Sequence, residues 1–186
     1  MSKSILKFFI VTLYIQTACS QENMPPILGQ EKNYSYEVIV DDISVPWGMA
    51  FISSDEFLVT EQSGILYHVQ NRVKNEIKGL PDVYFRGQGG LLDIALHPNF
   101  DTNKTIFFTQ GVNTENDNKG GNTSLYSGVI DGFKLTNVKL LYKATPNTKT
   151  SQHWGSRIVF DREGHIYFCI GDRGERDINP QYITRD

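Results

Sequence analysis

Hydrophobic residues recur along most of this chain in short runs that are separated by polar turns. Residues 36–40 (YEVIV) and 56–70 (EFLVTEQSGILYHVQ) alternate or run apolar, and Ser-Asp and Ser-Gly pairs interrupt the pattern. Such a pattern is typical of β-strands joined by tight turns. Beyond the first twenty residues, no stretch of useful length has the 3.6-residue period of an amphipathic helix. The pattern therefore predicts an all-β fold.

Three segments repeat one order of features: a small residue, an apolar strand, a turn, a second apolar strand and then polar residues. They are residues 47–64, 90–111 and 155–174, which align on Ala50, Ala95 and Val159. The second interval is the longer one because it contains a polar loop that is too poor in apolar residues to pack. Repeats of roughly 40–50 residues with four strands are typical of β-propeller blades. A β-sandwich also has short strands and turns, but the recurring unit favours the propeller.

Chain length limits how much of a propeller is present. A closed propeller needs about 4–8 blades, each of roughly 40–50 residues. We therefore expect residues 36–186 to be the N-terminal part of a β-propeller domain, covering roughly its first three to four blades. The sequence ends in NPQYITRD without a closing strand, which also suggests part of a longer protein. Residues 1–20 are expected to be a signal peptide, and residues 21–35 a linker or arm.

The N-terminal residues have the layout of a secretory signal peptide. Lys3 and Lys7 precede an apolar stretch at 8–14, and small residues follow. The apolar stretch is too short for a membrane span, which needs about 20 residues. Two outcomes stay open: cleavage after ACS, or lipidation of Cys19 in a bacterial lipoprotein, although Gln16 is unusual for the latter. We expect export to the bacterial periplasm or cell envelope, with membrane attachment only through such a lipid anchor.

Composition and cysteine content exclude several classes of function. The chain is 39% hydrophobic with a formal net charge of −3, an ordinary globular composition without the basic patch that nucleic acid requires. Cys19 and Cys169 are its two cysteines, so neither a disulfide nor a cysteine metal site is expected. Cys169 lies in an apolar strand, where a thiol is usually an inert core residue. The sequence contains no phosphate-binding loop, dinucleotide fingerprint, Gly-x-Ser-x-Gly elbow or His-Glu-x-x-His motif.

A histidine and an aspartate flank the last predicted hairpin. His153 comes just before its first strand and Asp172 just after its second. These two positions lie at the same end of a hairpin, so we expect the side chains to meet. An imidazole titrates near neutral pH and can accept a proton from a hydroxyl, provided that a partner fixes its tautomer. The alternative is a turn histidine beside an aspartate that caps a loop.

A glutamine precedes the equivalent strand in the second repeat. Gln88 is flanked by three glycines in FRGQGGLL. Equivalent positions of propeller blades converge at one end of the central channel, and an amide can both donate and accept hydrogen bonds to sugar hydroxyls. The alternative is a glycine-rich turn with an exposed glutamine. Glu61 and Gln62 also lie near a strand end. We expect structural roles for the remaining histidines, His68, His97 and His165, and for Trp47, which is expected to pack between blades.

The motifs VPWGMAF…LVTEQSGILYHV, GQGGLLDIALHPNF and QHWGSRIVFDREGHIYFCIGDRGERD together resemble the soluble glucose/sorbosone dehydrogenase family. They occur in the family's order, from about residue 38 to the end. The resemblance implies an exported six-bladed β-propeller that uses pyrroloquinoline quinone (PQQ) and calcium. It implies oxidation of the anomeric hydroxyl of an aldose to a lactone, by hydride transfer to the quinone.

The resemblance also implies roles for individual residues. His153 matches the catalytic base, Asp172 the aspartate that orients it, and Gln88 a glutamine that lines the sugar pocket. Gln152 and Arg173 fall at substrate-binding positions where glucose-specific members carry an aspartate and a glutamine. Both departures leave a broader aldose specificity open.

The family's cofactor-binding residues and calcium ligands lie in later blades, so we expect none of them in this chain. We therefore expect this fragment alone to be inactive, and the complete enzyme to need an aldose and an external electron acceptor. A non-catalytic propeller that binds a glycan or a protein is the alternative, although such a module needs no oriented base. A propeller lactonase or hydrolase would need metal-binding carboxylates around the channel, and none is placed convincingly.

Overall fold

The computed structural model describes residues 35–113, 120–174 and 176–177 of the 186-residue chain. The chain divides into two compact units, Met1–Glu37 and Val38–Asp186, and every strand belongs to the second unit. The predicted signal peptide and nearly all of the predicted arm lie outside the described residues. Among the residues that the structure covers, no helix has the length and apolar character needed to cross a membrane.

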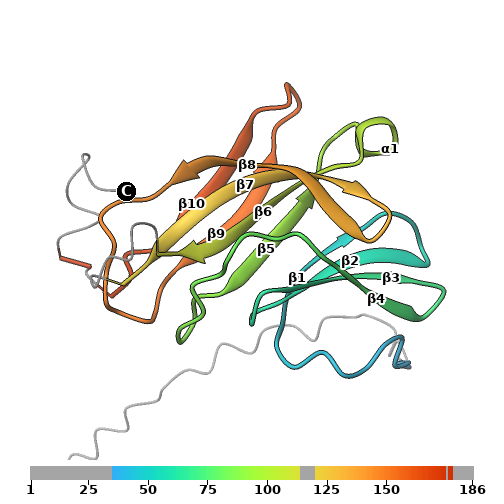
Figure 1. Cartoon of the computed structure of the whole chain (residues 1–186), viewed down its shortest axis with the longest axis horizontal. Helices are drawn as coiled ribbons and strands as arrows, with labels where there is room; N and C mark the ends of the chain where they lie inside the picture. The colour runs from blue at the N-terminus through green and yellow to red at the C-terminus, as the bar shows by residue number, and fades with distance from the viewer. Residues whose placement is uncertain (1–34, 114–119, 175, 178–186) are drawn as a thin grey trace, which may run out of the picture. The chain divides into compact units, whose positions relative to one another are not determined.

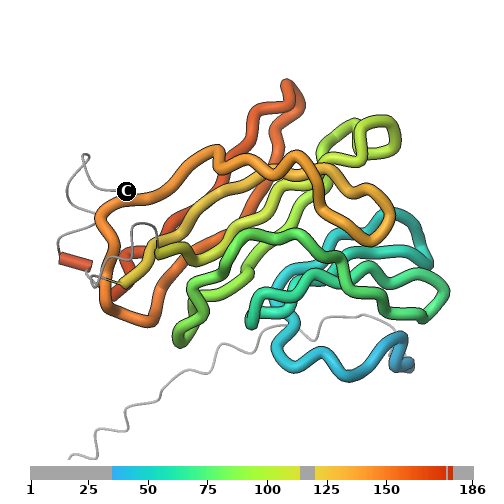
Figure 2. The backbone as a smooth tube through the Cα atoms, in the orientation of Figure 1, coloured from blue at the N-terminus to red at the C-terminus, as the bar shows by residue number. Residues whose placement is uncertain are grey.

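The second unit is built from three consecutive antiparallel sheets (Figure 1), which confirms the all-β prediction. The first two sheets have four strands each in the order of the sequence, and the third has two. The strands are β1 (Pro46–Phe51), β2 (Glu56–Glu61), β3 (Ile65–Gln70), β4 (Val73–Ile77), β5 (Leu91–Leu96), β6 (Thr105–Val112), β7 (Asn122–Asp131), β8 (Lys134–Lys143), β9 (Gly155–Phe160) and β10 (Ile166–Ile170), with one helical turn, α1 (Phe100–Asn103), between β5 and β6. The backbone goes up and down within each sheet before passing to the next (Figure 2), as in propeller blades.

The described residues thus form two complete four-stranded sheets and one hairpin. The predicted repeat length allowed for three to four blades, which is more than the described strands form. The connections 78–90 and 144–154 account for many residues of this shortfall, because they link one sheet to the next without adding strands.

The strand register confirms the alignment of the three repeats. Ala50, Ala95 and Val159 all lie in the first strand of their sheet, each opposite a residue of the second strand. In all three hairpins the register shifts near the same end, where the first strand begins and the second ends. Structurally equivalent strand ends are therefore brought to one edge of the molecule.

A threonine in the second strand joins each complete sheet to the next one. The hydroxyl of Thr60 accepts a hydrogen bond from Gly48 N (2.9 Å) and donates one to the carbonyl of Leu92 in β5. Thr109 repeats the arrangement between β5 and the carbonyl of Ser156 in β9 (3.1 Å). The register places Cys169 at the corresponding position of the third sheet. Its side chain is exposed there, so the expectation of a buried thiol is wrong.

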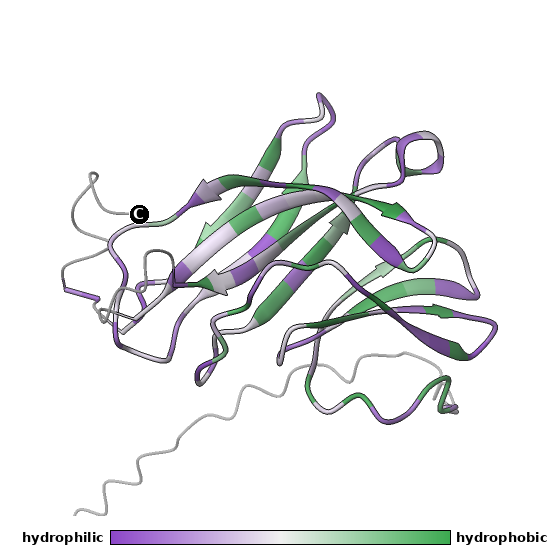
Figure 3. Cartoon of the chain, viewed as in Figure 1, coloured by the Kyte–Doolittle hydropathy of each residue, from purple (hydrophilic) through white to green (hydrophobic). Residues whose placement is uncertain are grey.

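The main hydrophobic core lies between the first two sheets. Leu58 and Leu66 of the first sheet pack in one cluster with Leu91, Ile106 and Phe108 of the second, and all five are nearly inaccessible to solvent. The strands carry most of the hydrophobic residues, whereas the turns are largely hydrophilic (Figure 3). This packing fixes the position of β5, which directly follows the glycine-rich loop of the candidate site.

Candidate active site

The hairpin of β9 and β10 brings His153 and Asp172 together, as its geometry predicts. Gly155 at the start of β9 lies opposite Ile170 at the end of β10, so the adjoining segments share one edge. His153 Nδ1 lies 2.7 Å from Asp172 Oδ1. The histidine side chain is 48% exposed, and the aspartate is less so. An imidazole that is open to solvent on one side and paired on the other can act on a bound molecule.

Hydrogen bonds keep Asp172 ionised. The backbone N–H of Gly174 donates to its Oδ1 at 2.8 Å. This hydrogen bond is the largest cause that lowers the pKa of Asp172, and the hydrogen bond from His153 is the next; partial burial has the opposite, smaller effect. An ionised carboxylate can only accept hydrogen bonds, so the proton between the two residues belongs to Nδ1, and this fixes the tautomer of the ring in its neutral form. Nε2 then carries the lone pair, which is the arrangement that a general base requires.

The backbone of His153 adopts a left-handed conformation, with φ of 58°. This region costs a non-glycine residue on the order of 1–3 kcal/mol, so the surroundings must hold it in place. The N–H of His153 donates to Oε1 of Gln88 (2.7 Å), and its carbonyl accepts from Arg173 N (3.0 Å). A side chain at Gly171 would come within 1.9 Å of that carbonyl. Glycine is therefore required where the two ends of the hairpin meet.

The glycine-rich loop before β5 supports this backbone from the second sheet. Gln88 N donates to the carbonyl of Ser151 (2.7 Å), while a Cβ at Gly87 would lie 2.4 Å from the same oxygen. Gln62, which is buried after β2, donates from Nε2 to the carbonyls of Gly87 (2.8 Å) and Gly89 (3.2 Å). Gln62, at the end of the first sheet, thus fixes the glycine-rich loop, and this loop in turn fixes the backbone of His153.

Trp154 anchors the same segment in the interior. Its indole is 2% exposed and packs against Gly89, where a Cβ would come within 2.5 Å of the ring. Its carbonyl accepts a 2.6 Å hydrogen bond from the hydroxyl of Thr123 in β7. The ring of Tyr84 lies 6.0 Å away, centroid to centroid. His153 and Trp154 therefore face solvent and core respectively.

The two other predicted substrate contacts have different surroundings. Gln152 is exposed beside His153, and its side chain lies against Gly174. Arg173 is only 1% exposed, and its Nη1 donates to the carbonyl of Gly171. Its guanidinium is therefore buried beside the loop, and its backbone, like that of His153, is left-handed (φ of 49°).

Asp93 is an ionisable residue near the site that sequence reasoning missed. It is buried in β5, where its Oδ2 accepts a 2.7 Å hydrogen bond from Ile158 N and its Oδ1 lies 3.3 Å from Nη1 of Arg157. It thereby joins β5 to β9, the strand that follows His153. An acidic residue inside the apolar run LLDIAL was the signal, because a buried carboxylate needs partners.

The remaining histidines have local partners, as expected. His68 pairs with Glu56 at 2.7 Å, and His97 Nδ1 accepts from Asn99 N at 2.9 Å. Trp47 is 41% exposed among the described residues, and its packing between blades stays a prediction, because the chain spans less than half of its relatives.

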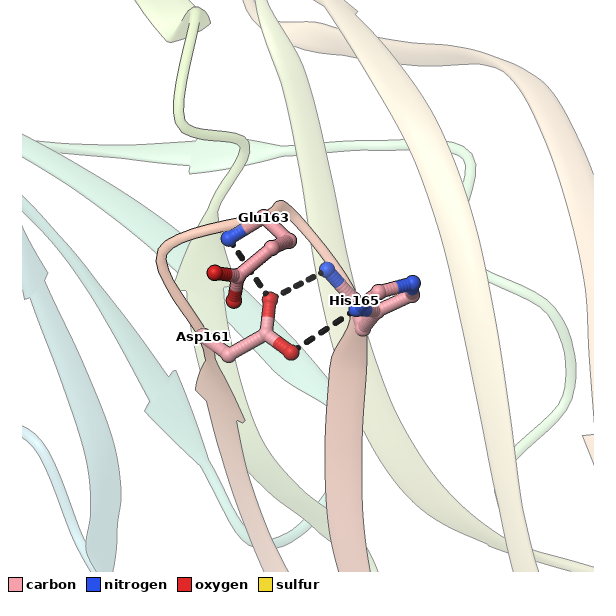
Figure 4. A group of neighbouring side chains, drawn as sticks. All are labelled: Asp161, Glu163 and His165. Atoms are coloured by element: carbon pink, nitrogen blue, oxygen red, sulfur yellow. Dashed lines mark hydrogen bonds and ion pairs between the residues drawn. The ribbon is translucent and has the colours of Figure 1, made fainter.

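One group in the described part of the chain has side chains close enough to hold a metal ion, namely Asp161, Glu163 and His165 (Figure 4). Both oxygens of Asp161 are occupied. Oδ1 accepts from Glu163 N (3.0 Å) and His165 N (2.8 Å), and Oδ2 from His165 Nδ1 (2.8 Å) and Tyr167 Oη (3.2 Å). The carboxylate organises the β9–β10 turn, at the opposite end of the hairpin from His153. The cluster therefore does not fit a calcium site that serves the base.

Comparisons with known proteins agree with this geometry. The chain is 32% identical over 144 residues to the aldose sugar dehydrogenase YliI of Escherichia coli (strain K12), covering 75% of this chain and 38% of that protein. The soluble aldose sugar dehydrogenase of Escherichia coli in its apo-form superimposes with a TM-score of 0.71 at 29% identity, covering 77% of this chain and 42% of that one. The chain thus spans less than half of these relatives.

The PQQ-bound aldose sugar dehydrogenase of Streptomyces coelicolor has a TM-score of 0.66 at 21% identity, covering 77% of this chain and 43% of that one. These structural likenesses confirm the predicted β-propeller. The sequence model of the Glucose / Sorbosone dehydrogenase family matches residues 43–186, nearly all of the strand-forming unit. The chain therefore belongs to the glucose/sorbosone dehydrogenase family.

Proposed function

We propose that the complete protein is an oxidoreductase that oxidises the anomeric hydroxyl of aldose sugars to lactones, with His153 as its general base. The observation that carries the proposal is the 2.7 Å contact between His153 Nδ1 and Asp172 Oδ1, at the edge where equivalent strand ends gather. The proposal concerns the complete protein, because this chain spans 38% of the curated aldose sugar dehydrogenase that it resembles.

His153 would take the proton of the anomeric hydroxyl at Nε2. As the C–O double bond forms, the hydrogen on the anomeric carbon leaves as a hydride with both electrons of its bond. The imidazole becomes positively charged, and the ionised Asp172 stabilises that charge. Such a base contributes typically about 10²–10⁴-fold to a rate.

The proposed cofactors are PQQ, which accepts the hydride when bound, and calcium. PQQ is favoured because a structure with the same fold contains it. Around His153, the described residues offer no set of free oxygens for calcium, since Asp172 is engaged by His153 and Gly174. We therefore assign to this chain only the proton-accepting part of the site. An external electron acceptor would then reoxidise the cofactor.

Three residues are proposed to contact the sugar: Gln88, Gln152 and Arg173. Gln88 and Gln152 are both exposed, and Gln152 directly precedes the base. Arg173 would reach a substrate only if its buried side chain turned outward. Gln152 lacks the carboxylate, and Arg173 the amide, that glucose-specific members carry at these positions, so we propose activity on a range of aldoses.

The experiment is dye reduction by the complete protein with aldose, PQQ and calcium. We expect His153→Ala to lower kcat by about 10²–10⁴-fold. His165→Ala is the matched control, because it removes an imidazole at the other end of the same hairpin. Full activity in His153→Ala would overturn the mechanism. Absence of PQQ binding by the unsubstituted protein would favour a propeller that binds a glycan or a protein without catalysis.

A further inference from the structure

We propose that Gln88 is a positioning residue that acts on the base through the main chain of His153. The inference rests on the proposed function, but it assigns to Gln88 a role other than lining a sugar pocket. Its Oε1 accepts the backbone N–H of His153 at 2.7 Å, and its own N–H donates to the carbonyl of Ser151 at 2.7 Å. Gln88 therefore holds both ends of the short segment that carries the base.

The conformation of His153 explains why such a partner is needed. A left-handed backbone is costly for a residue with a side chain, and it turns the N–H of His153 away from its own hairpin. Arg173 N supports the carbonyl side of the residue from the third sheet. Gln88 supports the N–H side from the second. With both groups fixed, the ring is directed at Asp172 before any ligand arrives.

Gln88 is itself held in place. Gln62 donates hydrogen bonds to the carbonyls on either side of it, those of Gly87 and Gly89. A chain of contacts thus runs from Gln62 in the first sheet, through Gln88 in the second, to His153 in the third. Misplacement of a reacting group by about 1 Å can cost on the order of 10²-fold in rate.

The chemistry of the amide restricts what else Gln88 can do. A carboxamide has one acceptor oxygen and two donor hydrogens on its nitrogen. The oxygen accepts from His153 and keeps one further lone pair, whereas both Nε2 hydrogens are left to donate to a sugar hydroxyl. This separation allows the two roles to be tested with different substitutions.

Gln88→Met keeps approximately the length of the side chain but removes the acceptor oxygen, whereas Gln88→Glu keeps an acceptor and removes the donor. If Gln88 positions the base, Gln88→Met lowers kcat by about 10–10²-fold with little change in KM, and Gln88→Glu retains most of kcat. Gln70→Met is the control, because it makes the same change at an exposed glutamine at the far end of β3.

A second measurement does not depend on activity. In the complete, ligand-free protein, the NMR signal of the Nδ1 proton shared with Asp172 is identified by its loss in His153→Ala. We expect this signal to weaken or vanish in Gln88→Met, and to persist in Gln88→Glu and Gln70→Met. An unchanged signal in Gln88→Met would overturn the proposal. So would a higher KM with normal kcat in both Gln88 variants, which would make Gln88 a sugar contact alone.

The two proposals fail separately. If His153→Ala retains sugar oxidation, the proposed mechanism is wrong, whereas the NMR comparison still decides whether Gln88 positions the imidazole.

Discussion

At the scale of single residues, the candidate site depends on two neighbours that face opposite ways. Trp154 is buried against Gly89, while half of the His153 side chain is exposed. The left-handed backbone of His153 allows this reversal within one short segment. The tryptophan fixes the segment, and the histidine is thereby presented to solvent in a defined orientation.

The charge of Asp172 should matter to both stability and activity. Its folded-state pKa is lowered by the Gly174 and His153 hydrogen bonds, so its contribution to stability is present above the ordinary aspartate value of 3.8 and is lost as the pH falls through the lower folded value. We expect Asp172→Asn to flatten the acid side of the Tm–pH curve.

We also expect Asp172→Asn to lower kcat by at least about 10-fold, because the imidazolium loses its counter-charge.

Asp161→Asn is the matched control for this prediction. The pKa of Asp161 is also lowered, because hydrogen bonds from His165, Tyr167 and Glu163 outweigh its partial burial. This variant should change the acid side of the Tm–pH curve and leave kcat unaltered. Equal loss of kcat in both variants would show that Asp172 acts only through stability.

The pairing of His153 with Asp172 could be predicted from the sequence, because a hairpin fixes which residues share an end. The burial of Arg173 and the hydrogen bond from His153 to Gln88 could not. Both depend on left-handed backbone angles and on contacts between sheets, and neither leaves a periodic pattern in the sequence.

At the scale of elements, side chains that cross between sheets fix the relative positions of the strands. Thr60 and Thr109 do so from the second strand of their sheets, and Asp93 does so from β5 to β9. The repeat alignment predicted which strands are equivalent, since apolar runs and turns recur. It did not predict these crossing contacts, because they depend on which side chains of neighbouring sheets meet.

Removal of the Asp93 carboxylate should weaken the attachment of β9 to β5 and so destabilise the protein. We expect Asp93→Ala to lower the free energy of unfolding of the complete protein by about 1–3 kcal/mol, because Ile158 N–H loses its buried partner. Denaturant unfolding would measure this loss. Arg157→Ala is the control, since that side chain is largely exposed and its loss should cost much less. Equal losses would show that the ion pair, and not the bond to the backbone, is what matters.

At the scale of the whole molecule, the family and the propeller follow from the strand-forming unit, and we propose that the first twenty residues decide the cellular destination. We propose export, with a signal peptide at 1–20 that is either cleaved or processed at Cys19. We expect mass spectrometry of the mature protein to find an N-terminus near Gln21, or a lipid on Cys19 in the membrane fraction. An intact Met1 in the mature protein would contradict export through this leader.

The path of contacts from Gln62 through Gln88 to His153 joins three sheets that are formed by widely separated parts of the chain. The orientation of the His153 backbone is therefore complete only when the third sheet has docked on the second. A β9–β10 hairpin that has formed but has not docked on the second sheet would lack the Gln88 hydrogen bond that holds the His153 backbone. In a refolding time course of the complete protein, we expect the signal of the shared Nδ1 proton to appear when the third sheet docks on the second.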